Sequence, residues 1–368
     1  MKKKVTLKDI AEALNLSRNT VSKVINGYSN VPDSTREKVL AKAIEMNYKR
    51  IPYSLTEQKK STSAVEIILI TKASSANVSF WTFVLQGIVK QSSQEGFETK
   101  LAVLTQNEID AVTLPAGISN RTAGFICLEI FPDNYIQKLE STQLPCVFID
   151  VPLYLWRRGM KSDLVCMENF CSMYHLVSHL IQKGHSEIGF VGNYKFGLNY
   201  YERYMGYFHA MKDAGLSIQE NQCIFEEGTG SVINSAHPQE ALLANGDSIS
   251  ANLSGGFSFT MDNEWFAKQL NRIPRMPTAF VCASDHLAIK LIPVLKLRGY
   301  RIPEDIAVTG FGDVPETTII EPNLTTVHTP KDALGSRAVE QLIWRISHRD
   351  APLETIHLRT ELKERASS

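Results

Sequence analysis

Hydrophobic residues at helical spacing mark three short segments at the start of the chain. In residues 6–14 the apolar side chains fall at positions 7, 10, 11 and 14, on one face of a helix, and Thr6 stands before them as a good N-cap. Ser17 precedes a second such segment, residues 18–25, which an Asn-Gly pair ends. A third segment covers residues 33–46. This pattern predicts three helices that share a small core, the first two joined by a tight turn as a helix-turn-helix.

From residue 65 onward, short apolar runs alternate with amphipathic stretches. The apolar runs predict strands over residues 65–70, 99–104, 122–128, 145–150, 187–191, 278–282 and 306–309. The amphipathic stretches predict helices over residues 83–94, 169–183, 203–214, 286–298 and 331–346. Such alternation is typical of parallel sheets covered on both faces, and the length suits two α/β subdomains. Ligands of such sheets bind beyond the carboxyl ends of the strands, so the residues just after strands are candidates for a binding site.

The composition is that of an ordinary globular protein. The chain has 368 residues, of which 43% are hydrophobic and 21% charged, so disordered, collagen-like and coiled-coil classes are excluded. No apolar run approaches the roughly 18 residues that cross a bilayer, and no apolar segment follows the basic N-terminus, so we expect no signal peptide. The six cysteines show no metal-binding spacing. We therefore expect buried thiols in a reducing cytoplasm, with no metal and no cofactor.

The zero net charge of the chain conceals an uneven distribution. Residues 1–60 hold 13 Lys/Arg and 6 Asp/Glu, a net charge of +7, so the other 308 residues hold 26 and 33, a net charge of −7. A small basic head on a mildly acidic body suggests that the head binds a polyanion. The alternative is a solvated basic tail.

The second predicted helix carries residue types that read DNA. In a helix-turn-helix this helix enters the major groove with its N-terminal end first. Arg18 can bond two acceptors of guanine, and Asn19 can pair with adenine. Three hydroxyl residues near the helix ends could hold phosphates: Thr6, Ser17 and Thr20. The alternative is a plain two-helix corner with a polar rim.

Several motifs resemble one bacterial family. Residues 5–11 (VTLKDIA), 17–27 (SRNTVSKVING) and 35–39 (TREKV) resemble the head of the lactose-repressor/galactose-repressor (LacI/GalR) family. Residues 282–288 (CASDHLA) and 299–313 (GYRIPEDIAVTGFGD) resemble its effector domain, and the resemblance extends over most of the chain. It implies an all-α helix-turn-helix head and a periplasmic-binding-protein-like body of two parallel α/β subdomains.

The resemblance also implies a function. It suggests a DNA-binding transcriptional regulator, usually a repressor, that pairs as a homodimer on a pseudo-palindromic operator and is controlled by a small-molecule effector. We expect a sugar or sugar derivative; the alternatives are a nucleobase, an anionic metabolite or control by a protein co-repressor. By resemblance, Arg18 and Asn19 take the positions of the base-reading pair, and Lys23 that of a third base contact. The expected DNA-contacting residues are Thr6, Ser17, Arg18, Asn19, Thr20, Ser22, Lys23, Asn26 and Leu55.

The same resemblance suggests domain boundaries. We expect a DNA-binding domain over residues 1–48, a hinge over 49–63, an effector-binding and dimerisation domain over 64–350, and a C-terminal strand or tail over 351–368. An insertion of about 228–256 lies in the effector domain. In the family, paired hinge helices push a leucine into the minor groove; Leu55 is the candidate here, although it stands closer to the head than usual. The alternative is that Leu55 packs against the body.

Charged and aromatic residues after the strands form the expected effector site. An Arg fork opposite a carboxylate, as in Arg203 and Asp285, grips vicinal hydroxyls, or a carboxylate with an amine; the alternative is a salt bridge that closes an empty cleft. The resemblance adds an aromatic pair that could stack on a sugar or a base, or simply pack in the core. The alternative for Asp313 is that it caps a turn. The alternative for Phe257 is that it lies in a strand that buries one apolar face. The expected effector-contacting residues are Phe80, Trp81, Asp150, Asn169, Arg203, Phe257, Asp285 and Asp313.

Two other classes of protein fit the sequence less well. A transport-type solute-binding protein would share the body but would need an export signal and no basic head. For an enzyme, the nucleophile elbow, phosphate loop, zinc-helix motif and dinucleotide glycine triplet are all missing. His175 and His179 have a zinc-like spacing, but no third ligand is near in the sequence. We therefore expect no enzymatic activity.

Overall fold

The computed structural model describes residues 5–25, 31–46, 48, 65–73, 79–129, 131–195, 197–225 and 262–368. Four of the sequence-based expectations lie outside these residues. They are the hinge over 49–63 with Leu55, the insertion over 228–256, Asn26 and Phe257.

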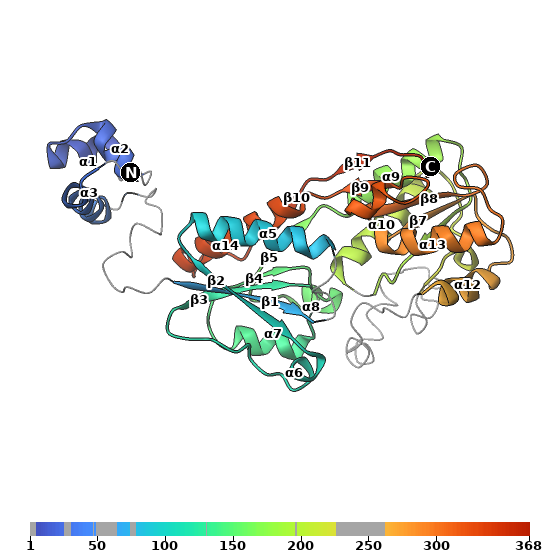
Figure 1. The fold of residues 1–368 in the computed structure, drawn as a ribbon, viewed down its shortest axis with the longest axis horizontal. Coiled ribbons are helices and arrows are strands. Elements are labelled where there is room, and N and C mark those ends of the chain that lie inside the picture. Colours follow the sequence, from blue (N-terminus) through green and yellow to red (C-terminus); the bar gives the residue numbers. More distant parts are fainter. Residues whose placement is uncertain are drawn as a thin grey trace.

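The head consists of three helices around a small core (Figure 1). Their bounds are Leu7–Leu14 for α1, Arg18–Ile25 for α2 and Asp33–Glu45 for α3. A capping box starts α1, because the Thr6 side chain accepts from the Asp9 backbone N–H while the Asp9 carboxylate accepts from the Thr6 N–H. The core side chains with no exposed area are Ile10, Val21, Val24, Val39 and Ala43. Three helices therefore share one core, as the sequence pattern predicts.

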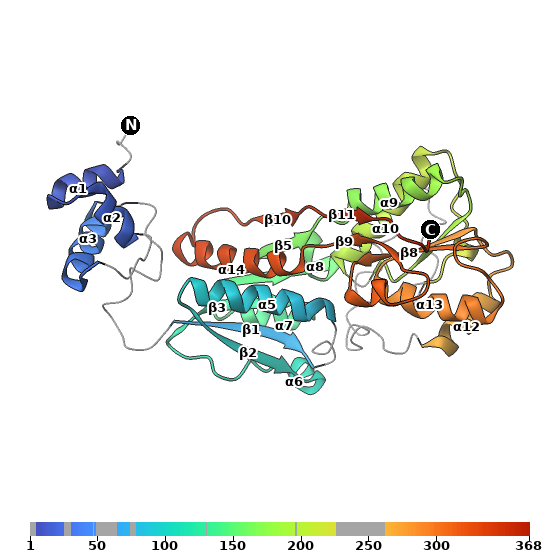
Figure 2. The same cartoon turned by 45° about the horizontal axis from the view of Figure 1, so that its top comes forward.

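The first subdomain of the body is built on sheet A. Within the described residues its strand order is β10-β5-β4-β3-β1-β2, and every neighbouring pair is parallel. The strands are β1 (Glu66–Lys72), β2 (Glu98–Leu104), β3 (Thr122–Leu128), β4 (Cys146–Ile149), β5 (Asp163–Met167) and β10 (Thr355–Leu358). The helices are α5 (Ser79–Gln94), α6 (Gln106–Asp110), α7 (Asp133–Glu140), α8 (Leu153–Arg158) and α14 (Lys331–Ser347). Ile67 and Leu69 of β1 belong to one hydrophobic cluster with residues of α5 and α14, and Ile68 and Ile70 to another with residues of α6 and α7. Figure 2 shows α5 beside α14 over this sheet.

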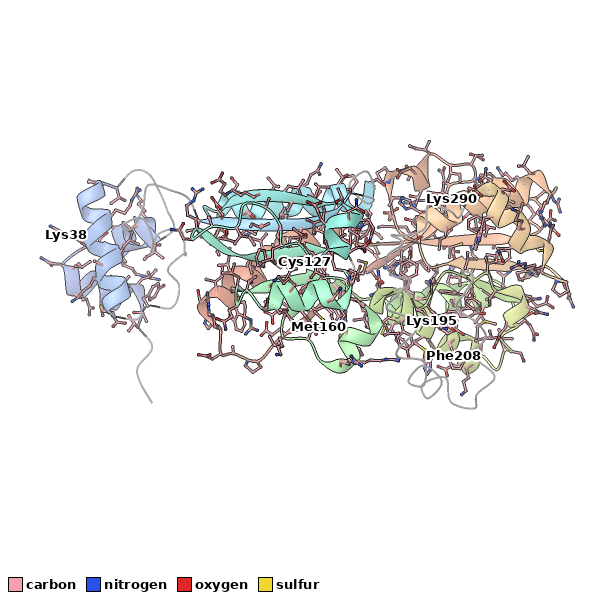
Figure 3. The ribbon with its side chains drawn as sticks, turned by 90° about the horizontal axis from the view of Figure 1, so that it is seen from below. Lys38, Cys127, Met160, Lys195, Phe208 and Lys290 are labelled. Carbon is pink, nitrogen blue, oxygen red and sulfur yellow. The ribbon has the colours of Figure 1, made fainter. Side chains whose placement is uncertain are left out.

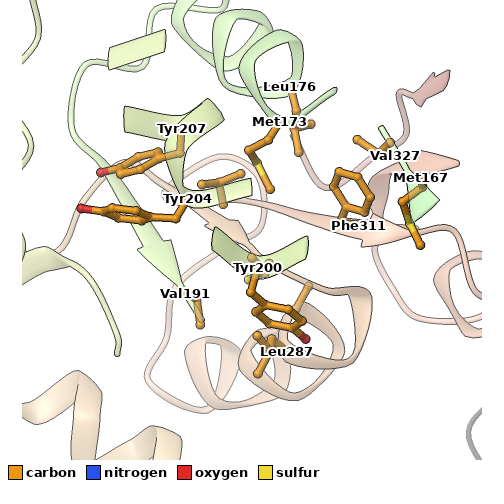
Figure 4. Packing of buried hydrophobic residues seen from close by; sticks show 14 of the residues in the cluster. Met167, Met173, Leu176, Val191, Tyr200, Tyr204, Tyr207, Leu287, Phe311 and Val327 are labelled. Carbon is orange, nitrogen blue, oxygen red and sulfur yellow. The ribbon is translucent and has the colours of Figure 1, made fainter. Parts of the chain in front are cut away.

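The second subdomain is built on sheet B, in the order β11-β9-β8-β7-β6. Its strands are β6 (Ile188–Val191), β7 (Ala279–Cys282), β8 (Ala307–Gly312), β9 (Thr325–His328) and β11 (Glu361–Lys363). Its helices are α9 (Phe170–Gln182), α10 (Leu198–Asp213), α12 (Asn263–Asn271) and α13 (Asp285–Leu297), with 3-10 turns η1 (Glu220–Gln222) and η2 (Pro315–Thr318). Tyr204 and Tyr207 of α10 pack beside Met173 and Leu176 of α9 (Figure 4). The pairs are parallel except β11 with β9, which is antiparallel.

The described chain passes between the subdomains three times: from β5 to α9, from β9 to α14, and from β10 to β11. In Figure 3, Cys127 marks the interior of the first subdomain, and Phe208 and Lys290 mark the second. A buried ion pair secures the returning helix, because Arg345 of α14 donates to both oxygens of Asp163 at the start of β5, at 2.8 and 2.7 Å. These crossovers bring the carboxyl ends of the two sheets close to each other.

The predicted mixed α/β fold is confirmed, but β5, β9, α6, α7, α8 and α12 were not predicted, and two helices begin earlier than expected. The helix expected over residues 83–94 begins at Ser79. The helix expected over residues 203–214 begins at Leu198, so Arg203 lies in its second turn and not at its start. No N-cap side chain marks the true start, which follows Gly197. None of the helices in the described part of the chain is long and apolar enough to span a membrane.

Candidate DNA-reading head and effector site

The polar face of α2 carries the predicted base-reading residues. Arg18 and Asn19 are exposed in its first turn, and Val21, Val24 and Ile25 are buried on the opposite face. Ser22 and Lys23 are partly exposed one turn further on. The buried face fixes the helix on the head, so the polar face is free to enter a groove.

Three hydroxyl residues expected to contact phosphates also shape the helix starts. The Ser17 hydroxyl accepts from the Thr20 N–H at 2.9 Å and shares a hydrogen bond with the Thr20 hydroxyl at 2.8 Å. The Thr6 hydroxyl donates to Asp9 at 2.7 Å. Thr6 and Ser17 cap helices in this structure, and Thr20 lies within α2, so at two of the three positions the sequence signal for a phosphate contact coincides with the signal for a cap.

Arg203 lies at the junction of the two subdomains. Its Nε donates to Asn169 Oδ1 at 2.9 Å, its Nη1 to the Ala283 carbonyl at 2.7 Å, and its Nη2 to the Met167 sulfur at 3.5 Å. The guanidinium lies 3.9 Å from the centre of the Phe311 ring. An arginine has five N–H donors, so two have no acceptor among the described residues, although only 5% of the residue is exposed. Burial lowers the pKa of Arg203, and the group is well placed to bind a ligand oxygen.

Asp150 faces Arg203 from the other subdomain. It follows β4, is 5% exposed, and has a left-handed backbone with φ of 69°. Its Oδ2 accepts from the Asn199 side chain of α10 at 2.9 Å, and beside it the Leu198 N–H donates to the Val151 carbonyl at 3.0 Å. Burial raises the pKa of Asp150 to about 6. Among the described residues no cation lies within ion-pair distance of its carboxylate.

Asp285 and Asp313, both predicted, direct their carboxylates to their own subdomain. Asp285 has no exposed area; it accepts from the Thr326 hydroxyl at 2.5 Å and from the Val314 N–H at 2.9 Å. Burial raises the pKa of Asp285 to about 6. Asp313 accepts from His328 at 2.8 Å and from Arg365 at 2.6 Å. No direct Arg203–Asp285 salt bridge exists in this structure: within the described chain the two residues interact only through their charges.

The predicted aromatic pair and Asn169 lie at the same junction. Phe80 and Trp81 begin α5 and meet edge to face, with ring centres 5.2 Å apart, and both are partly buried. The Lys331 ammonium lies 5.8 Å from the Phe80 ring centre. The Asn169 amide donates to the Met167 carbonyl and to Glu202, both at 2.9 Å, which turns its oxygen toward Arg203.

Sequence reasoning missed several polar groups beside this site. Glu129 follows β3 with φ of 82° and accepts from the Thr71 hydroxyl at 2.6 Å. Lys72 ends β1, its ammonium 5.4 Å from the Phe131 ring centre, and burial lowers its pKa. The Ser284 hydroxyl, just before α13, is buried and has no hydrogen-bond partner among the described residues. Their positions at strand ends were the available signal.

The comparisons with known proteins agree with both halves of the chain. A model of bacterial regulatory proteins of the lacI family matches residues 6–50, and a model of the periplasmic binding protein-like domain matches residues 177–368. The chain belongs to the lacI family of bacterial regulatory proteins and is a DNA-binding transcriptional regulator. Repressors of this family bind operator DNA and small-molecule effectors as dimers. The family and the class of function predicted from the sequence are therefore confirmed.

Its relatives include repressors that match along nearly their full length. The HTH-type transcriptional repressor PurR of Mannheimia succiniciproducens is 26% identical over 367 residues, covering 98% of each chain. The PurR repressor of Klebsiella pneumoniae subsp. pneumoniae is 28% identical over 370 residues, covering 98% of this chain and 96% of the relative.

Solved structures of regulators share the fold. A complex of the transcriptional regulator CelR with cellobiose has a TM-score of 0.67 at 23% identity, covering 99% of this chain and 100% of the other. The lac repressor dimer bound to operator and the anti-inducer ONPF has a TM-score of 0.61 at 21% identity, covering 99% of both.

Proposed function

We propose that this regulator is a repressor that binds a pseudo-palindromic operator as a homodimer and responds to a sugar or sugar derivative bound between its subdomains. The observation that carries the proposal is the pair Arg203 and Asp150. They are buried, oppositely charged and not ion-paired with each other, and they stand on different subdomains. A ligand that bridges them alters the relation between the subdomains, and a coupling of roughly 1–3 kcal/mol to the head is typical of such regulators.

A sugar is the effector that suits these groups best. Its hydroxyls both donate and accept, so one ring satisfies the spare donors of Arg203 and the carboxylate of Asp150 together. Phe80 or Trp81 offers an aromatic face to the apolar side of the ring. Asp285 and Asp313 act in this proposal by holding the strand ends of sheet B, and Asn169 by orienting Arg203.

The domain organisation is part of the proposal. It assigns residues 1–48 to DNA binding, 49–63 to the hinge, and 64–350 to effector binding and dimerisation. The tail, residues 351–368, belongs to the body, since β10 pairs with β5 and β11 with β9. The protein acts in the cytoplasm and has no enzymatic activity, in keeping with its relatives, which are transcriptional repressors.

The second copy covers apolar side chains that are exposed in the single chain. Leu101 and Val103 are 53% and 42% exposed on β2, the edge strand of sheet A. Leu297 and Ile319 of the second subdomain are 83% and 78% exposed. An exposed apolar edge strand favours association with another chain. A two-fold-symmetric dimer is the commonest arrangement in which a second copy covers such a surface.

Selection of random duplex DNA by the full-length protein tests the DNA-reading part. We expect a two-fold-symmetric site. We also expect Arg18→Ala to weaken binding to that site by about 1–3 kcal/mol and to relax the preference at one base pair, because the bidentate contact to guanine is lost. Unchanged affinity and preference, measured at the same salt concentration, would remove Arg18 from base reading.

A ligand panel tests the effector part. Thermal unfolding is followed with neutral mono- and disaccharides, sugar phosphates and purine bases, and any stabilising compound is then titrated against the protein–operator complex. We expect a sugar to raise the midpoint, since ligand that binds only the folded state stabilises it, and Arg203→Ala to remove the rise. Stabilisation by a purine base alone would contradict the sugar proposal and leave the DNA-reading part intact.

A further inference from the structure

The ends of three neighbouring strands place charged residues in a row. Leu128 of β3 pairs with Ile149 of β4, and the Glu129 N–H donates to the Ile149 carbonyl at 3.0 Å, so Glu129 and Asp150 follow at the same level. On the other side of β3, the Lys72 N–H of β1 donates to Glu129 Oε1 at 3.4 Å. Lys72, Glu129 and Asp150 therefore lie side by side at the carboxyl edge of sheet A. All three are at most 8% exposed.

The partners of these carboxylates differ. Glu129 receives the Thr71 hydroxyl and the Lys72 N–H, and the Lys72 ammonium interacts with its charge. Among the described residues, Asp150 receives one hydrogen bond, from the neutral amide of Asn199. Buried carboxylates are normally paired with a cation, so Asp150 is the exception in this row.

The cation whose charge acts on Asp150 is Arg203, which forms its hydrogen bonds with other groups. Arg203 interacts with the charge of Asp150, but its hydrogen bonds go to Asn169, Ala283 and Met167. Two further carboxylates, Glu202 and Glu129, add negative charge around Asp150. Glu202 itself holds the Asn169 amide and lies 3.9 Å from His357 of β10.

At the other subdomain the unsatisfied groups are donors. Two N–H groups of Arg203 and the buried hydroxyl of Ser284 have no acceptor among the described residues. Ser284 directly follows Ala283, whose carbonyl Arg203 binds. Oxygen atoms of a ligand, as hydroxyl, ring or carbonyl oxygens, are the acceptors that these donors lack.

We propose that the effector is an amine-bearing sugar, whose ammonium group pairs with Asp150 at the edge of sheet A and whose oxygens accept from Arg203 and Ser284. The inference rests on the proposed function, because it specifies the chemical class of the sugar derivative. A neutral sugar leaves Asp150 without a counter-charge, and a sugar acid adds a fourth carboxylate beside Asp150, Glu129 and Glu202.

Calorimetric titration of the full-length protein at neutral pH with matched sugars tests the proposal. The pairs are glucosamine with glucose, galactosamine with galactose, and mannosamine with mannose. N-acetylglucosamine keeps the bulk of the amine substituent without its charge, and glucuronate reverses the charge. We expect at least one amine to bind about tenfold or more tightly than its neutral parent, the factor that 1.4 kcal/mol produces, and N-acetylation to remove this gain.

Variants assign the gain to Asp150. Asp150→Asn keeps the size of the side chain and should reduce the preference for the amine to within about twofold, whereas Asp110→Asn, on the exposed helix α6, should leave it unchanged. Equal or tighter binding of the neutral parents overturns the amine assignment and keeps the sugar-responsive regulator. Failure of every amine to bind overturns the assignment, and stabilisation by purine bases alone overturns the proposed sugar effector as well.

Discussion

Single residues at the proposed effector site hold buried charges that form no ion pair within the described part of the chain. Arg203 and Asp150 are each 5% exposed, and each forms its hydrogen bonds with neutral groups. Keeping such charges apart costs stability, because a desolvated charge without a partner is unfavourable. A ligand that supplies the missing partners recovers that free energy on binding. The residues that bind the effector most tightly are thus expected to be those that destabilise the unliganded fold.

Asp150→Asn should stabilise the unliganded protein at neutral pH. The folded-state pKa of about 6, raised by burial from 3.8, means that the fold holds this proton more tightly than the unfolded chain does. The ionised carboxylate therefore reduces stability as pH rises from 3.8 toward 6, with Arg203 opposing and Glu202 and Glu129 adding to the effect. A two-unit shift corresponds to at most about 3 kcal/mol, so we expect a gain of about 1–3 kcal/mol above pH 6.

Urea unfolding at neutral pH and at pH 4 measures this effect. Because the wild-type carboxyl is protonated in the fold at the lower pH, the gain should shrink there toward zero. Asp110→Asn is the control, since Asp110 is exposed and its carboxylate accepts from Gln106 at 2.8 Å. A variant that is less stable at both pH values would show that the Asn199–Asp150 contact outweighs the burial of charge.

The sequence predicted which residues follow the strands but not where their side chains point. Asp285 follows β7 as predicted, but its carboxylate turns to Thr326 and Val314, which are 41 and 29 residues away. Those contacts depend on how β8 and β9 lie beside β7, which hydrophobic spacing does not record. Lys72 and Glu129 were not predicted, because the apolar pattern that identifies a strand does not show which polar residues at its end face the other sheet.

At the scale of elements, local signals determined what could be predicted. The head helices and β3 agree with their predicted ranges to within about a residue, since caps and periodicity act within a few positions. The C-terminal strand or tail expected over residues 351–368 contains two short strands, β10 and β11, which join different sheets. β10 pairs with β5, about 190 residues earlier, and half of its residues are exposed. The antiparallel β11 pairs with β9, 33 to 37 residues earlier.

Two glycines allow α5 and α14 to cross at close range. A Cβ on Gly87 would overlap the backbone carbonyl of Asp332, and a Cβ on Gly335 would overlap that of Val84. The Ser336 hydroxyl donates to the Gly87 carbonyl at 3.2 Å within the same contact. Because α14 arrives directly from sheet B, this contact anchors one of the three crossovers to the first subdomain.

Gly87→Ala should destabilise the protein although alanine favours helices. Replacing an exposed helix glycine by alanine typically stabilises by up to about 1 kcal/mol, whereas forcing a methyl group into a filled contact costs about 1–3 kcal/mol. We expect a net loss of about 1–2 kcal/mol in urea unfolding at neutral pH. Lys90→Ala, on the exposed face of α5, is the control and should change stability by less than about 0.5 kcal/mol. A Gly87→Ala variant more stable than wild type would refute the close crossing.

At the scale of the whole molecule, the head reads DNA and the body is proposed to bind the effector. The two-fold symmetry of the dimer connects the two roles. One head presents one short polar helix, which contacts too few bases for a tight site, and two heads joined by a dimeric body read two half-sites at once. The proposed effector site lies at the crossovers, so we expect a ligand there to act on the relation of the subdomains, and through it on the spacing of the heads. This arrangement requires that the body, and not the head, holds the dimer together.

Leu101→Lys should therefore weaken the dimer and operator binding together. Leu101 is 53% exposed on the edge strand β2, and at a two-fold interface the substitution occurs twice. Burying two unpaired ammonium groups should raise the dimer dissociation constant by about 100-fold or more, as measured by sedimentation equilibrium. Operator affinity should fall at protein concentrations where the dimer is lost, and recover at higher concentration.

Leu353→Lys, at a residue 48% exposed between α14 and β10, is the matched control. Equal dissociation constants for the two variants would place the dimer interface elsewhere on the body.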